Sequence, residues 1–176
     1  LCFINKMDRV GADFDGTVEE IRTTLGSNPV VMTYPIGAAD TFEGVVDILR
    51  MKAIHFDEES RGVNMTLSEI PEPLREVCEQ ARQTMIERAA EQDDELLEKF
   101  FATGTLSDAE VLKGIRKGCL SRKLVPVYCG TAFKNKGVQP LLDGVTRFLP
   151  SPLDIGPVHA HGDPASARHP RDDEPF

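Results

Sequence analysis

The stretch FINKMDRVGADF, residues 3–14, decides the fold of this chain. Residues 1–4 are continuously apolar, as strands of a parallel sheet tend to be when both faces are buried. The apolar run ends abruptly in Asn5, Lys6, Met7 and Asp8. Open α/β sheets bind ligands beyond the carboxyl ends of their parallel strands. These four residues therefore form either a surface turn or part of a binding pocket.

The side chains of this loop suit a guanine base. Guanine presents its N1–H and 2-amino donors side by side, and the Asp8 carboxylate can accept both in a charge-assisted contact. Lys6 can lay its methylenes across the base while its ammonium stays in water. Asn5 carries both a donor and an acceptor, which suits it to pin the loop and touch the base edge. A bidentate contact of this kind discriminates between bases by roughly 1–3 kcal/mol.

A second loop, CGTAF at residues 129–133, follows another short apolar run at residues 124–128. Small residues let a backbone N–H come close to a ligand. The N–H of Ala132 is placed to donate to guanine O6, the acceptor that Asp8 cannot serve. Taken alone, this loop is more typical of an ordinary strand-to-helix turn than of a binding loop. The four-residue match in the first loop carries its own false-positive risk.

Periodicity, turn residues and caps predict the remaining elements. A helix capped by Asp15 or Thr17 is expected to end near Leu25. Strands are expected at residues 30–36, 44–49 and 52–56, followed by an irregular segment at 57–73. One long amphipathic helix is expected at about 73–101. A capping box at Ser107 predicts the start of the next helix. Pro126 predicts an edge position for the strand at 124–128. A last helix is expected at 138–149.

This order of elements predicts an interrupted α/β fold. The first and last pieces are expected to share one sheet. As many as 122 residues lie between Asp8 and Thr131, whereas a simple parallel crossover needs only about a dozen or more. The middle of the chain is therefore predicted to be an inserted α+β subdomain.

Composition and charge narrow the class of protein. The chain has 176 residues, with no apolar run long enough for a membrane span and no secretory signal. Its four cysteines are scattered along the sequence, which is typical of a reduced cytosolic protein. The segment 57–98 holds thirteen acidic and four basic side chains, which accounts for the whole net charge of −9. Such a surface repels phosphate backbones, so we expect no direct nucleic-acid binding by this segment. Both termini look cut, and the chain is expected to be a fragment.

A metal site is not favoured by the sequence. His159, His161 and His169, with Asp163, lie in a segment rich in proline, glycine and alanine. They show no regular ligand spacing, which favours a solvated tail over a metal centre.

Four longer stretches resemble bacterial elongation factor G, the translocation GTPase. They are INKMDRVGADF, PIGAADTFEGVVDIL with MKAIHF after it, CGTAFKNKGVQPLLDGV, and FLPSPLD, and they cover nearly the whole chain in order. The resemblance implies that Asn5, Lys6, Met7 and Asp8 recognise guanine. It also implies that Thr131, Ala132 and Phe133 form the second base-binding loop. The family usually has serine at the position of Thr131, and a backbone contact tolerates this change.

The resemblance also implies a division into domains. Residues 1–27 and 121–156 would belong to a partial P-loop GTPase domain, residues 28–120 to its inserted acidic subdomain, and residues 157–176 to the start of a β-barrel domain. In the family the helices of the inserted subdomain face the ribosomal stalk protein. The acidic helical region therefore becomes a candidate partner surface on the ribosome.

Several functional elements of such a GTPase are absent from this sequence. It has no GxxxxGK[ST] loop for phosphates and magnesium, and no catalytic Asp or water-positioning residue is identified. The chain is therefore expected to hold only the base half of a GTP or GDP site and to be inactive alone. Nucleotide binding and Mg²⁺ are expected to need the full-length cytoplasmic parent. The alternatives are another translational GTPase, such as a ribosome-protection protein or release factor, and a non-catalytic stalk-binding module.

Overall fold

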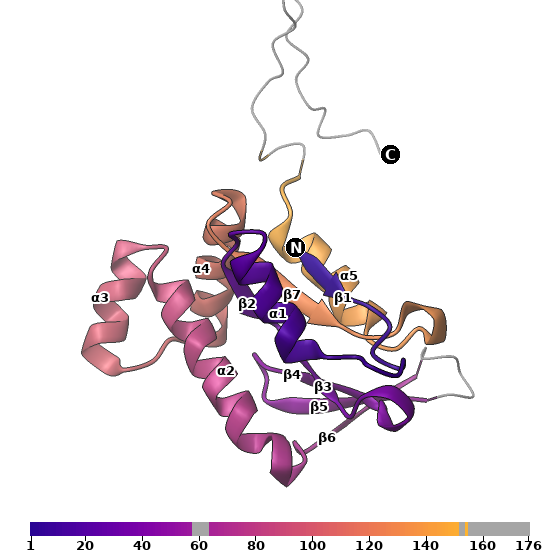
Figure 1. The fold of residues 1–176 in the computed structure, drawn as a ribbon. Coiled ribbons are helices and arrows are strands. Elements are labelled where there is room, and N and C mark those ends of the chain that lie inside the picture. The colour runs from indigo at the N-terminus through magenta and orange to yellow at the C-terminus, as the bar shows by residue number, and fades with distance from the viewer. Residues whose placement is uncertain (58–63, 152–153, 155–176) are drawn as a thin grey trace, which may run out of the picture.

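A parallel sheet carries both predicted base loops (Figure 1). Its strand order is β1-β7-β2, formed by β1 Cys2–Ile4, β7 Val125–Cys129 and β2 Pro29–Val31. The computed structural model describes residues 1–57, 64–151 and 154. Both base loops follow the carboxyl ends of neighbouring strands, β1 and β7, which run in the same direction. The sheet thus brings together loops that are far apart in the sequence.

A second, antiparallel sheet follows directly. Its order is β3-β4-β5-β6, with β3 Thr33–Ile36, β4 Gly44–Asp47, β5 Lys52–Phe56 and β6 Met65–Ser68. The short helix η1, Ala39–Thr41, lies in the connection between β3 and β4. This sheet and the helices that follow it form the α+β part expected between the two base loops.

The helices pack on the parallel sheet, apart from one that packs on a neighbouring helix. They are α1 Phe14–Thr23, α2 Glu72–Ala90, α3 Asp94–Thr103, α4 Asp108–Leu120 and α5 Val138–Phe148, with the short η2 at Ala132–Lys134. Helix α2 packs against β2 and α4, while α4 and α5 pack against β7 and against each other. In Figure 1, α2 and α3 project to the left, and α5 lies on the right beside β7.

One apolar core joins the parallel sheet to the middle of the chain. The cluster includes Val30 of β2, Met85 of α2, Ile115 of α4, Tyr128 of β7 and Phe148 of α5, all of them buried. Burying a side chain of this size stabilises a fold by about 1.5–3 kcal/mol. The elements on either side of the predicted domain boundaries at residues 28 and 120 therefore share a core.

The single strand predicted at residues 30–36 is wrong, because the chain changes sheets at Met32. The Met32 N–H donates to Val127 O in the parallel sheet at 2.8 Å, and Met32 O accepts from Ile48 N at 3.1 Å. The apolar pattern runs through this point without a break, so periodicity alone could not show that it serves two sheets.

Two helix predictions need correction at a capping residue. Asp13, rather than Asp15 or Thr17, caps α1, with its Oδ1 accepting from Gly16 N at 2.9 Å. The long helix expected at 73–101 is two helices, because Asp93 caps α3 by accepting from the N–H groups of Glu95 and Leu96. An N-cap residue has non-helical backbone angles, so a helix cannot continue through Asp93, and a new helix begins after it.

The segment at 57–73 also contains a strand that was not predicted. β6, Met65–Ser68, pairs with β5, and each of its side chains is exposed. Met65 and Leu67 alternate with Thr66 and Ser68, which is the pattern of a strand. The alternation spans only four residues inside a polar segment, and it was overlooked for that reason.

The edge position inferred from Pro126 is wrong as well, since β7 is the central strand of its sheet. Successive residues of a strand direct their N–H groups to opposite neighbours. Val125 N donates to Asn28 O on the β2 side at 2.9 Å, so the missing N–H of Pro126 faces the β1 side. There the ladder begins only at the next residue, where Val127 lies opposite Cys2.

Candidate functional site

The first loop is fixed mainly by backbone contacts. Lys6 adopts a left-handed φ of 64°, which turns the chain so that Arg9 N donates to Lys6 O at 3.0 Å. Met7 is only 2% exposed. Its N–H donates to Gly130 O at 3.1 Å, and its carbonyl accepts from Ala39 N at 2.9 Å. The loop is therefore attached both to the second base loop and to the β3–β4 connection.

The second loop is a tight turn closed by its own backbone. Thr131 and Lys136 exchange two N–H···O bonds of 2.9 and 3.1 Å. Gly137 follows with φ 84°, and a Cβ atom there would lie 2.4 Å from Cys129 O. Only glycine tolerates both that conformation and that approach, so the turn returns the chain to α5 immediately after the loop.

Asn5 joins the two loops. Its Oδ1 accepts from Lys6 N at 2.8 Å and from Ala132 N at 3.0 Å. The acceptor oxygen of this side chain thus holds the loops together, while its contact with the edge of a base stays a prediction. The Ala132 N–H has an acceptor within the chain, so an incoming base oxygen must share this N–H or displace Asn5 Oδ1.

Asp8 lies between the two loops and is held as a carboxylate. Its side chain is 13% exposed, and Oδ2 lies 3.3 Å from Lys134 Nζ. The pKa of Asp8 is lowered, first by a hydrogen bond from the Thr131 hydroxyl, then by Lys134, with a smaller contribution from its own backbone N–H. Burial opposes this shift, because it disfavours the charged form. The net result is an ionised acceptor beside the Ala132 turn.

Two further side chains of these loops are exposed to solvent. Phe133 is 96% exposed although it follows a buried Thr131, and Lys6 is also exposed. Neither contributes to the core, so both are available for contact with a flat ligand over the loops.

The structure brings all seven candidate residues into two adjoining loops. Sequence reasoning missed Lys134, which contacts Asp8, although its charge stands only two residues after Ala132. It also missed the support from Ala39, which acts through its backbone N–H. A backbone donor leaves no signal in the sequence.

The histidines considered as metal ligands lie outside the described residues. Within residues 1–57, 64–151 and 154, no group of three or more His, Cys, Asp or Glu side chains is arranged to hold a metal ion. The four cysteines are free thiols. Over the same part of the chain, no helix combines the length and apolar character needed to cross a membrane.

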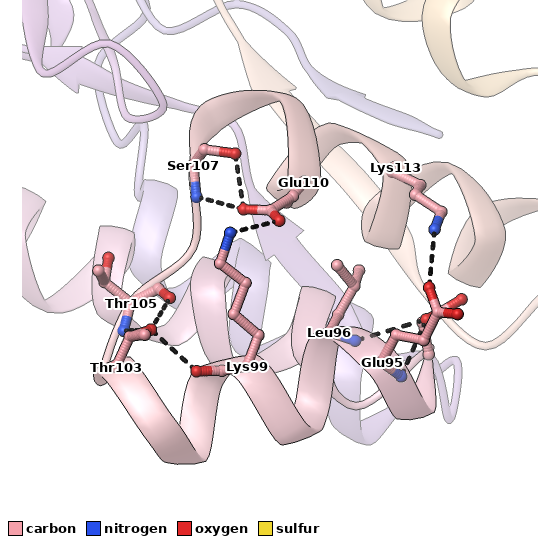
Figure 2. A network of polar contacts seen from close by, with 9 residues as sticks. Glu95, Leu96, Lys99, Thr103, Thr105, Ser107, Glu110 and Lys113 are labelled. Atoms are coloured by element: carbon pink, nitrogen blue, oxygen red, sulfur yellow. Dashed lines mark hydrogen bonds and ion pairs between the residues drawn. The ribbon is translucent and has the colours of Figure 1, made fainter.

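A network of polar contacts joins α3 to the start of α4 (Figure 2). Figure 2 shows Lys99 of α3 and Ser107 before α4 converging on Glu110. Lys99 Nζ lies 2.7 Å from the Glu110 carboxylate, and Ser107 donates to it through both N and Oγ. Lys99 and then Ser107 lower the pKa of Glu110 to about 2. The Glu110 carboxylate thus joins α3 to α4.

Comparison with known proteins identifies the family. Residues 1–151 match the family of the elongation factor Tu GTP binding domain. The chain belongs to this family. A solved structure of a protein from Thermus thermophilus is similar to it, with a TM-score of 0.76 and 26% sequence identity over 88% of this chain. The match covers 23% of that longer chain, so the present chain spans about a quarter of its length.

Family membership confirms the fold class predicted from the sequence. The parallel sheet and its helices are part of an α/β GTPase domain, and the antiparallel sheet and acidic helices form the part inserted between its base loops. A GTP-binding domain also makes guanine nucleotide the ligand class of this family.

Proposed function

We propose that this chain is the base-recognition part of a translational GTPase of the elongation factor G type. The full-length parent would hydrolyse GTP and promote movement of tRNA and mRNA on the ribosome. The observation that carries the proposal is that the loop of Asp8 and the turn at Ala132 lie side by side. Asn5 of the first loop holds them together, because its Oδ1 accepts from Ala132 N at 3.0 Å. A non-catalytic binding module would have no need to hold an ionised carboxylate beside this turn.

Each proposed contact follows from the chemistry of the two loops. Asp8 would accept the N1–H and 2-amino donors of guanine, while the stem of Lys6 covers one face of the base. Ala132 would donate to O6 once Asn5 Oδ1 shares or releases its N–H. Thr131 would act through its hydrogen bond to Asp8, Met7 through its backbone contacts, and Phe133 as an exposed apolar neighbour of the base.

The remaining parts of the reaction would come from elsewhere in the parent. The sequence of this chain contains no GxxxxGK[ST] loop, and such loops hold the phosphates and Mg²⁺. We therefore place GTP hydrolysis and magnesium binding outside the chain, and expect the fragment to be inactive alone.

The partners and domain limits belong to the same proposal. Residues 28–120 would form the inserted subdomain, 1–27 and 121–156 the GTPase part, and 157–176 the start of the next domain. The exposed acidic side chains of α2 and α3 would face the ribosomal stalk protein. The parent would act in the cytoplasm.

The experiment that tests the proposal uses the full-length protein. A coding sequence upstream of Leu1 that contains GxxxxGK[ST] and DxxG motifs is the first requirement. Titration with a fluorescent guanine nucleotide should then show binding that GDP abolishes and ADP does not. Ribosomes should stimulate GTP hydrolysis, and a translocation assay separates elongation factor G from release and ribosome-protection factors. Absence of guanine binding would leave the stalk-binding module as the function.

A further inference from the structure

Lys134 is a basic side chain of the second base loop to which the proposed guanine contacts give no role. It ends the short helix η2, where its N–H donates to Thr131 O at 3.2 Å. The next residue, Asn135, turns left-handed with φ 57° and donates to Ala132 O at 3.0 Å. The base of the Lys134 side chain is therefore fixed by the same turn that presents Ala132.

The ammonium of Lys134 reaches back to the first loop. Its Nζ lies 3.3 Å from Asp8 Oδ2, and the Lys134 side chain is 51% exposed whereas that of Asp8 is 13% exposed. The buried Thr131 donates to the same carboxylate through its hydroxyl. One loop thus supplies two side-chain donors to a carboxylate of the other loop.

Two donors restrict a carboxylate more than one does. With the Thr131 hydroxyl alone, the Asp8 carboxylate can still rotate about its Cβ–Cγ bond, because that torsion is broad and roughly two-fold. A second donor at Oδ2 selects one orientation. A carboxylate has about four acceptor positions. Thr131, Lys134 and, more weakly, the Asp8 backbone N–H use part of them, and the rest stay available to a ligand.

We propose that Lys134 is a positioning residue for guanine recognition, which orients the Asp8 carboxylate toward the base without touching the base itself. This inference rests on the function proposed above and names a further residue of the same site. It makes the Lys134–Asp8 pair part of the affinity for guanine nucleotides. Because the Lys134 side chain is half-exposed, the contribution of the pair is modest and is screened by salt.

The test compares Lys134→Met, Lys134→Arg and Asp8→Asn in the full-length protein, with GDP as the probe. Lys134→Met removes the charge but keeps a long side chain, and it should weaken GDP binding about fivefold, the upper end for an exposed ion pair. Lys134→Arg should restore most of the affinity. The deficit should shrink in about 1 M salt, where the Debye length is only about 3 Å.

A pH profile separates positioning of Asp8 from a merely structural role. Lys134 lowers the pKa of Asp8, so Lys134→Met should move the acid limb of GDP binding to higher pH. The same substitution at Lys123, an exposed lysine between α4 and β7, is the matched control and should change neither the affinity nor the acid limb.

The outcomes distinguish this inference from the proposed function. If the unmodified protein binds no guanine nucleotide, the proposed function fails. If Asp8→Asn weakens GDP binding while Lys134→Met changes neither affinity, salt response nor acid limb, only the role of Lys134 is refuted. Tighter GDP binding by Lys134→Met would mean that the lysine competes with the base, which also overturns the proposal.

Discussion

Replacing Asp8 by asparagine should convert guanine recognition into xanthine recognition. Hydrogen bonds to a charged group contribute about 1.5–3 kcal/mol each, and neutral ones about 0.5–1.5 kcal/mol. The introduced amide keeps one acceptor for N1–H and turns an NH₂ donor toward the 2-amino donor of guanine. Asp8 is largely buried between Thr131 and Lys134, so water cannot readily relieve this donor–donor conflict.

The expected loss for GDP follows from these magnitudes. One charge-assisted bond is weakened and another is lost, which removes about 2–3 kcal/mol, or about 30- to 150-fold in Kd. Xanthine carries a carbonyl in place of the 2-amino group, and the same NH₂ can donate to it. XDP should therefore bind the variant more tightly than GDP does.

Competition between a fluorescent guanine nucleotide and unlabelled GDP or XDP measures both affinities in the full-length protein. Unchanged GDP affinity would refute the assignment of Asp8 to the base. Loss of GDP binding without any gain for XDP, in a variant with an unchanged thermal midpoint, would refute the donor-pair reasoning while leaving Asp8 in the site.

Three further predictions concern stability and the isolated chain. Gly114→Ala should lower the free energy of unfolding by about 2 kcal/mol, because the added Cβ would lie 2.4 Å from Ala89 O, where α4 packs on α2. Urea denaturation measures this loss, and Lys113→Ala, the neighbouring control, should have little effect. Lys99 and then Ser107 hold the pKa of Glu110 at about 2 rather than 4.5, so the stability that these contacts contribute is present above about pH 4.5 and is lost as pH falls toward 2. Urea midpoints between those pH values should fall more steeply in the unmodified chain than in Lys99→Met, and parallel curves would refute this. The isolated 176-residue chain should show negligible guanine nucleotide affinity, and a submicromolar Kd in a fluorescence titration would contradict that expectation.

Elements with a local signal were predictable from the sequence. Local residues predict each of these elements: apolar runs between turn residues for β4 and β5, and the capping box at Ser107 for the start of α4. The change of sheet at Met32 does not, because one apolar run serves both sheets. The end of α2 was hidden in the same way, since apolar spacing continues past Asp93 while the cap interrupts the backbone.

The candidate site shows the same limit. Its seven residues were named from side-chain chemistry and family resemblance, and the sheet places them in adjoining loops. What holds the loops in place comes largely from main-chain atoms, such as the N–H groups of Met7 and Ala39. Lys134 was overlooked because its partner lies far away in the sequence, and only the fold brings them together.

The shared core has a mechanical consequence. Val30, Met85, Ile115 and Phe148 belong to one packed cluster, and packed interiors are hardly compressible and transmit strain. Helix α4 rests on β7, and β7 ends at Cys129, directly before the second base loop. A force applied to α2 from outside would therefore pass through α4 and β7 to the turn at Ala132.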